Sequence, residues 1–173
     1  MKSRLNFQEK GLTLVESITV LAIILIFMIV VTLNYRGAGL SFALLNNAHI
    51  LVQNLRVMEE KATSAQDASG TKGSYGIYIA GINSVSYILF DDKNGNMGYD
   101  AAGGEKIEEV NFSKRISLKS VTPTLPLVIL FSPPDPSVYI TGSAAEATIV
   151  LQAQEIAAIN TIKVNKSGLV SIK

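Results

Sequence analysis

The chain has 173 residues, a net charge of +1 and no cysteine. Its length allows one modest globular core in addition to a membrane segment. The nearly balanced charge gives no electrostatic footprint for nucleic acid over the whole chain. The absence of cysteine excludes disulfides, thiol chemistry and cysteine-based zinc sites, so the fold must be stabilised by packing alone.

A basic leader and a long apolar run open the chain. Residues 1–11 read MKSRLNFQEKG, and the 22 residues from Leu12 to Leu33 carry one charge, on Glu16. As a helix this run would be about 33 Å long, enough to cross the hydrocarbon core of a membrane. A carboxylate in such a segment is costly in lipid and is usually retained for a partner charge. Residues 36–39 lack the small-residue pattern at which a conventional secretory signal is cleaved.

The motif GLTLVE at residues 11–16 resembles the class III signal of type IV pilins and type II secretion pseudopilins. In that family a prepilin peptidase cleaves after the glycine and methylates the new amino terminus. The resemblance assigns the cleavage to the Gly11–Leu12 bond, the new amino terminus to Leu12 and the fifth-position glutamate to Glu16. Leu12 stands where the family usually has phenylalanine. The alternative is a plain single-pass anchor in which the glutamate is incidental.

A helical pattern continues beyond the apolar run and predicts one helix from about Thr13 to Gln66. Its second half carries an apolar stripe at spacings of three and four residues, with polar residues largely off the stripe. We therefore expect residues 12–36 to be buried in lipid or among identical helices, and residues 37–66 to lie against a globular domain. The stripe consists of Leu44, Ala48, Leu51, Leu55, Met58 and Ala62.

From Ser74 onward apolar residues alternate with polar or small ones, as they do in half-buried strands. The alternating segments that predict strands are 75–79, 85–89, 147–151, 162–164 and 170–172. The run 127–131 is continuously apolar and predicts a strand covered on both faces, whereas 133–145 is expected to be mostly loop. The predicted fold is α+β, with the long N-terminal helix packed on a C-terminal antiparallel β-sheet domain of one or two sheets. The expected organisation is a leader at 1–11, a membrane and assembly helix at 12–36, an amphipathic continuation at 37–66 and a β-rich domain at 70–173.

A second resemblance narrows the subfamily. The segment FDDKNGN at residues 90–96, followed by Asp100 and the pair Gly104-Glu105, resembles the central hairpin of H-type minor pseudopilins and related minor pilins. That resemblance implies a pair of antiparallel sheets packed beside the helix.

The same segment invites comparison with a calcium loop. Residues 92–100 begin like an EF-hand loop, but the sixth position is Met97, where glycine is needed, and the twelfth is Gly103, where a bidentate glutamate is needed. A polar hairpin turn is the interpretation that the sequence favours, because asparagine and glycine supply positive φ cheaply. A looser calcium site would draw on the oxygen atoms of Asp91, Asp92, Asn94, Asn96 and Asp100.

The sequence gives little support for catalysis or for nucleic-acid binding. His49 is the only histidine and lies beside the stripe on the predicted helix, and no recognised catalytic motif occurs, so we expect no enzyme. Some H-like minor pilins capture DNA with arginines near the C-terminal hairpin. Here that stretch has Lys163, Lys166 and Lys173 instead, which are more typical of a solvated face.

The resemblance therefore implies a structural subunit of a type IV pilus or a type II secretion pseudopilus. It would be inserted in the cytoplasmic membrane by one span, with its C-terminal domain outside the cytoplasm, and would then enter an extracellular or periplasmic filament. The implied partners are other subunits, a prepilin peptidase, an assembly ATPase and an inner-membrane platform. We expect the amino terminus of Leu12 to pair with Glu16 of a neighbouring subunit. The alternative is a membrane-anchored module whose β domain binds DNA or another ligand.

Overall fold

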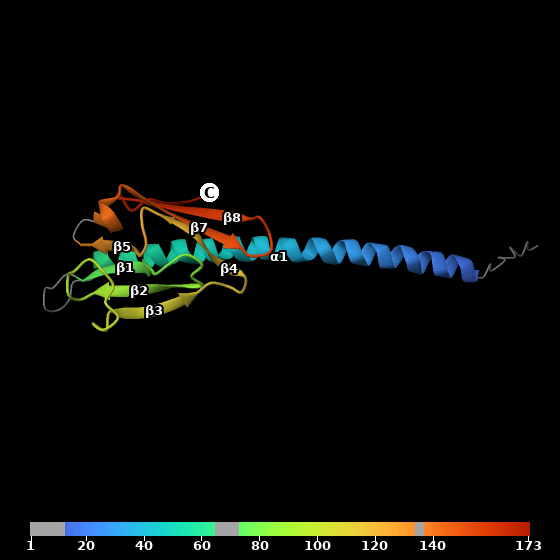
Figure 1. Ribbon diagram of the computed structural model, residues 1–173, viewed down its shortest axis with the longest axis horizontal. Helices are drawn as coiled ribbons and strands as arrows, with labels where there is room; N and C mark the ends of the chain where they lie inside the picture. The colour runs from blue at the N-terminus through green and yellow to red at the C-terminus, as the bar shows by residue number, and fades with distance from the viewer. Residues whose placement is uncertain (1–12, 65–72, 134–136) are drawn as a thin grey trace, which may run out of the picture. The chain divides into compact units, whose positions relative to one another are not determined.

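The computed structural model describes residues 13–64, 73–133 and 137–173. The predicted leader, the Gly11–Leu12 bond and the predicted helix end at 66–70 lie outside these residues. The chain divides into two compact units, Met1–Ala38 and Gly39–Lys173, which we call the first and the second unit. One helix, α1, spans Leu14–Ser64 (Figure 1).

The described part of the first unit is helical and almost wholly apolar. Its large side chains are exposed, including Leu14, Leu25 and Phe27, which is 66% exposed. Apolar surface of this extent requires lipid or other helices around it. By its length and composition, α1 is one helix near the N-terminus that could span a membrane.

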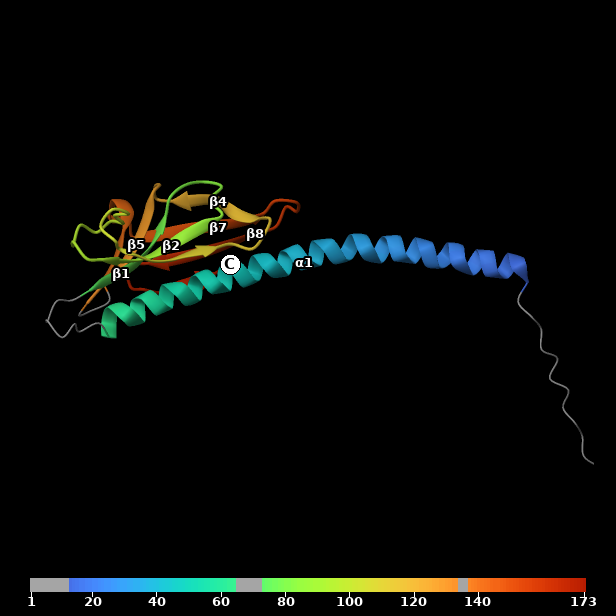
Figure 2. The ribbon, with the colours of Figure 1, turned by 90° about the horizontal axis from the view of Figure 1, so that it is seen from below.

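The second unit contains the remainder of α1 and two sheets (Figure 1). One sheet has the strand order β3-β2-β1-β5-β6 and the other β4-β7-β8-β9, and every strand pair among the described residues is antiparallel. Figure 2 shows the last turns of α1 running alongside the strands. The strands are β1 (Ser74–Ile79), β2 (Ser86–Asp92), β3 (Lys106–Asn111), β4 (Ile116–Thr122), β5 (Leu127–Ser132), β6 (Ser137–Ile140), β7 (Glu146–Ala153), β8 (Ile159–Asn165) and β9 (Val170–Ile172).

The predicted apolar stripe of the helix is confirmed as one side of the core. All six of its residues are at most 2% exposed. They belong to one cluster with inward-facing residues of both sheets, among them Ile129 of β5 and Ile149 of β7. Since a helix stripe and two sheet faces bury each other here, neither sheet needs a partner outside this unit to cover its inner face.

Two polar contacts join the helix to β2 and to the connection between β3 and β4. The Asn54 side-chain amide donates to the Tyr87 hydroxyl of β2 at 2.6 Å. Burial raises the pKa of Tyr87 to about 12, because the phenolate would lose its hydration. The buried Asn47 accepts from the Ser113 backbone N–H at 3.0 Å and donates to the Ala43 carbonyl at 2.6 Å. Because hydrogen bonds require specific partners and apolar contacts do not, these contacts help to set the position of the helix along its axis.

The expectation that 133–145 is mostly loop is wrong for residues 137–140. Residues 137–140 form β6, which pairs with β5, and Thr141–Ser143 form the 3-10 turn η1. Val138 and Ile140 face the core, while Tyr139 packs on the opposite face of the sheet. The strand has only four residues between prolines and a glycine, too few to show a period in the sequence.

The run 127–131 is a strand covered on both faces, as predicted. Leu127, Ile129 and Phe131 face the helix, whereas Val128 and Leu130 face outward. The outer side chains form a second small cluster with Phe90, and Tyr99 packs onto that cluster from the loop between β2 and β3. The ring centroids of Phe90 and Tyr99 are 5.7 Å apart. This contact anchors the β2–β3 loop to the sheet.

Candidate functional site

The first candidate site is the beginning of α1, where Glu16 lies in the first turn. Thr13 directly precedes the helix, and its hydroxyl accepts from the Glu16 backbone N–H at 3.3 Å. In return, Glu16 Oε2 accepts from the backbone N–H and the hydroxyl of Thr13, at 3.0 and 2.9 Å. This reciprocal pair is a capping box, which satisfies N–H groups that a helix start otherwise leaves unpaired.

The capping box gives Glu16 a role that the sequence interpretation missed, although the pattern Thr-x-x-Glu signals it. The carboxylate is held over the helix N-terminus, where the helix dipole favours a negative charge. Its side chain is exposed, so it is open to a charge from another molecule. The predicted processing residues, Gly11 and Leu12, lie outside the described residues.

The second candidate site is the loop of residues 92–105, at the end of β2. The buried Asp92 carboxylate accepts three backbone N–H groups of the loop: Oδ1 from Gly95 and Asn96, at 2.9 and 3.1 Å, and Oδ2 from Met97 at 3.0 Å. Asn94 Oδ1 accepts from the same Asn96 N–H at 3.0 Å. The structure therefore brings Asp92 and Asn94 together around one donor.

The backbone of this loop resembles the start of an EF-hand more closely than the residue types suggest. The side-chain oxygen of Asn96 accepts from the Gly98 N–H at 2.8 Å, so the alternate residues 92, 94 and 96 all turn their oxygens toward the loop backbone. Met97 has a φ of 61° and Gly95 a φ of 72°. Met97 thus adopts the left-handed conformation for which the sixth position of an EF-hand uses glycine.

Two further acidic residues complete the loop. Glu105 is 1% exposed, and its Oε2 accepts from the Asp100 backbone N–H at 2.8 Å. Its Oε1 is buried and has no hydrogen-bond partner within the described part of the chain. The Asp100 carboxylate instead accepts from the Ala102 N–H at 3.0 Å. Asp91 alternates with Asp92 along β2, so its side chain leaves the strand on the opposite face.

Sequence reasoning did not single out Glu105 as a residue of this site, because its burial depends on how the loop folds. Among residues 13–64, 73–133 and 137–173, no three histidine or acidic side chains gather as a metal cluster. The side-chain oxygens of the loop belong both to carboxylates and to neutral amides.

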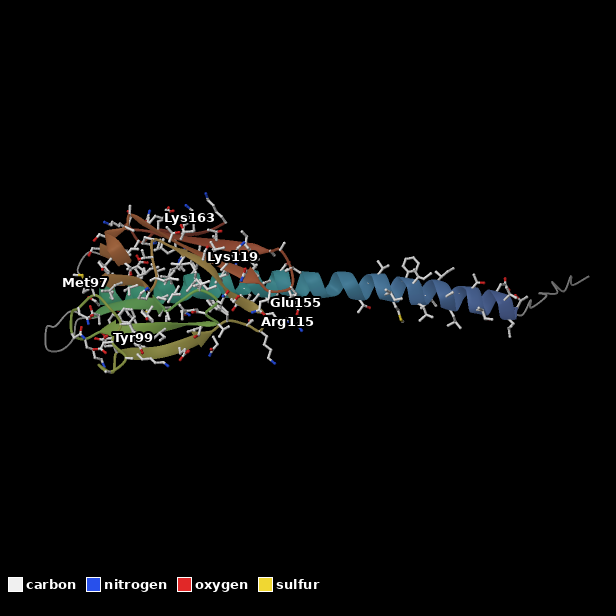
Figure 3. The ribbon with its side chains drawn as sticks, viewed as in Figure 1. Met97, Tyr99, Arg115, Lys119, Glu155 and Lys163 are labelled. Atoms are coloured by element: carbon white, nitrogen blue, oxygen red, sulfur yellow. The ribbon has the colours of Figure 1, made fainter. Side chains whose placement is uncertain are left out.

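One basic residue of the C-terminal hairpin, Lys163, is held in an ion pair. Lys163 of β8 contacts Glu146 of β7, with 2.5 Å between Nζ and Oε1. This contact holds the pKa of the Glu146 carboxyl below its usual range. Figure 3 labels Lys163 on β8 and Lys119 on β4, and shows Arg115 beside Glu155, its partner in another ion pair. His49 is exposed on α1, off the buried stripe.

No family model, curated protein or solved structure matches this chain. The fold class therefore follows from the structure itself: α+β, with one long N-terminal helix packed on two antiparallel sheets. This layout, with a helix that could span a membrane, is consistent with a pilin-like protein.

Proposed function

We propose that the chain is a structural subunit of a pilus-like filament, either a type IV pilus or a type II secretion pseudopilus. It is processed by a prepilin peptidase between Gly11 and Leu12 and assembled through the first half of α1. The observation that carries the proposal is the motif GLTLVE at the start of an apolar helix whose residues 14–33 carry one charge, on Glu16. The packing of a membrane-capable helix on two antiparallel sheets supports it.

The position of Glu16 suggests how register is chosen during assembly. In a stack of identical helices the surroundings are dry, and an unpaired carboxylate there is strongly destabilising. The new amino terminus of Leu12 on one subunit supplies the matching positive charge for Glu16 on its neighbour. A subunit out of step leaves either charge without a partner. The pair thus selects one axial register, while the apolar side chains supply attraction that is not specific.

The proposed setting follows from this role. The precursor is a single-pass protein of the cytoplasmic membrane with its second unit outside the cytoplasm, and an inner-membrane platform and an assembly ATPase move it into the filament. The role requires no catalytic residue. We do not extend the proposal to DNA capture, because Lys163 is paired with Glu146 and the C-terminal hairpin has no arginine.

The test separates the charge of Glu16 from its capping function. Glutamine also serves in a capping box, so Glu16→Gln keeps the start of the helix and removes only the charge. Cells carrying each variant as their sole copy are sheared, and the protein is quantified in the sheared and the membrane fractions. Glu16→Gln should be processed and inserted normally but should be missing from sheared filaments.

A matched control is Glu60→Gln, which makes the same chemical change at an exposed position of α1 in the second unit. It should assemble at the wild-type level. If Glu16→Gln also assembles at the wild-type level, the charge pair is not needed and the assembly mechanism is wrong, while the capping function of Glu16 would stand.

A further inference from the structure

Asn94 and Gly95 are the one Asn-Gly pair of the sequence, and both are exposed in the loop between β2 and β3. An asparagine followed by glycine loses its side-chain amide more readily than other asparagines, because the glycine has no side chain to hinder attack by its nitrogen. The two reacting atoms are always within reach of each other, since the backbone of Asn94 joins them. The pair is therefore intrinsically reactive.

The loop needs this pair for its shape. Gly95 has a φ of 72°, in the left-handed region that favours glycine. Asn94 Oδ1 accepts from the Asn96 backbone N–H at 3.0 Å, which is a turn that asparagine side chains make readily. The residues that form the turn are thus the same ones that make it chemically labile.

The reaction of such a pair is deamidation, and water is its co-reactant. The Gly95 nitrogen loses its proton and bonds to Asn94 Cγ, the bond from Cγ to the side-chain nitrogen breaks, and ammonia leaves. Water then opens either carbonyl–nitrogen bond of the resulting cyclic imide, which gives aspartate or isoaspartate at position 94. Near neutral pH, ring closure requires the Gly95 nitrogen without its proton.

In the folded loop a carboxylate holds that proton. The Gly95 N–H donates to Asp92 Oδ1 at 2.9 Å. Asp92 is 7% exposed and ends β2, where it is paired with Ser74 of β1, so the sheet fixes its position. A negative charge beside the Gly95 nitrogen disfavours a second negative charge on that nitrogen. Asp92 therefore opposes the ionisation on which ring closure depends.

The backbone that follows Gly95 is restrained as well. Asp92 Oδ1 also accepts from the Asn96 N–H at 3.1 Å, and Oδ2 accepts from the Met97 N–H at 3.0 Å. Figure 3 labels Met97 on this loop. Because Asn94 Oδ1 shares the Asn96 donor, the same set of bonds restrains the side chain that has to turn onto the Gly95 nitrogen.

We propose that Asn94 is a deamidation site that the Asp92 carboxylate keeps unreactive while the β2–β3 loop is folded. Ring closure in the folded loop must first break a hydrogen bond to a charged group. We therefore expect deamidation to be about 10- to 100-fold slower in the folded loop than in the unfolded chain. The inference does not depend on the proposed filament.

The product would not restore the loop. Isoaspartate lengthens the backbone between residues 94 and 95 by one carbon, which moves the N–H donors out of line with Asp92. Aspartate adds a second carboxylate to the turn that already holds Asp92, and like charges at this spacing repel. Either product therefore marks permanently a chain whose loop has opened.

The first experiment compares the wild-type full chain in detergent micelles with the same chain unfolded in urea, both in neutral buffer. Samples are digested at acidic pH, where deamidation is slow, and the asparagine, aspartate and isoaspartate forms of the peptide that contains residue 94 are separated and weighed. The unfolded chain should deamidate at Asn94 about 10- to 100-fold faster than the folded chain. Equal rates would overturn the proposal.

Hydrogen exchange of the Gly95 amide tests the mechanism without a variant. Exchange near neutral pH also begins with removal of the N–H proton, so it reports on the ionisation that ring closure needs. In the folded protein this exposed amide should exchange at least about tenfold more slowly than in the unfolded chain. A Gly95 amide that exchanges at the unfolded rate would contradict the role given to Asp92.

Two variants separate the Asp92 charge from the order of the loop. Asp92→Asn keeps the shape of the side chain and removes the charge, so it should speed deamidation at Asn94 about tenfold or more in the folded protein. The matched control Asp100→Asn makes the same change in the same loop, where the carboxylate accepts from the Ala102 N–H instead. It should leave the rate at Asn94 unchanged. An Asp92→Asn protein as slow as the wild type, or an Asp100→Asn protein as fast as Asp92→Asn, would overturn the proposal.

Discussion

Replacing Leu55 by alanine should destabilise the second unit by about 3–5 kcal/mol. Leu55 lies in the middle of the helix stripe, is 0% exposed and belongs to the cluster that joins α1 to both sheets. The change removes buried methyl groups and leaves a cavity, and the neighbouring elements are too constrained to close it. For a chain of this length the loss corresponds to a melting temperature about 10 °C lower.

The measurement is the thermal unfolding of the full chain in detergent micelles, followed by the near-ultraviolet signal of the tyrosines. Tyr87, which packs against Phe112 with ring centroids 5.4 Å apart, reports on the core. The matched control is Val57→Ala, two residues away and 42% exposed, which should change the stability by no more than about 0.5 kcal/mol. Equal melting temperatures for the two variants would refute the idea that this stripe carries the core.

Two further substitutions test the sheets and the helix contact. Gly76→Ala should cost about 1–3 kcal/mol in a denaturant titration, because a Cβ on Gly76 of β1 would lie 2.4 Å from the Ile129 carbonyl oxygen of β5. Tyr87→Phe should cost about 1 kcal/mol at neutral pH, because the Asn54 amide loses its acceptor. The pKa of Tyr87 is raised to about 12 from an ordinary 10.0, so its contribution is complete below pH 10 and is lost as the pH rises toward 12. Urea titrations over that range should therefore show the gap between wild type and Tyr87→Phe narrowing, and a constant gap would contradict this.

The helix and its buried stripe were predictable from the sequence, because the helix is long and its apolar spacing repeats over many turns. The same holds for the continuous apolar run of β5, which is covered on both faces. Strands β3 and β4 were not among the predicted strands. β3 is an edge strand with almost no buried residue, and β4 contains a register shift between Leu118 and Ser120 that interrupts its alternation.

In the two candidate sites, too, some features are visible in the sequence and others depend on how the chain folds. The lone charge of Glu16 is visible in the sequence, and its partner Thr13 follows from a known local pattern. The burial of Glu105 could not be predicted, since it depends on a return of the chain through Gly103 and Gly104 and on the packing of Tyr99 against the sheet. The conformation of Met97 was also hidden, because methionine rarely adopts a positive φ.

The central claim, that this chain is a processed filament subunit, is tested most directly by the intact mass of the protein extracted from membranes of its own cells. The account predicts one species that begins at Leu12, lighter than the full chain by residues 1–11 and heavier than the cleaved chain by one methyl group. A protein that still begins at Met1, or that begins beyond the apolar run of residues 12–33, would contradict it.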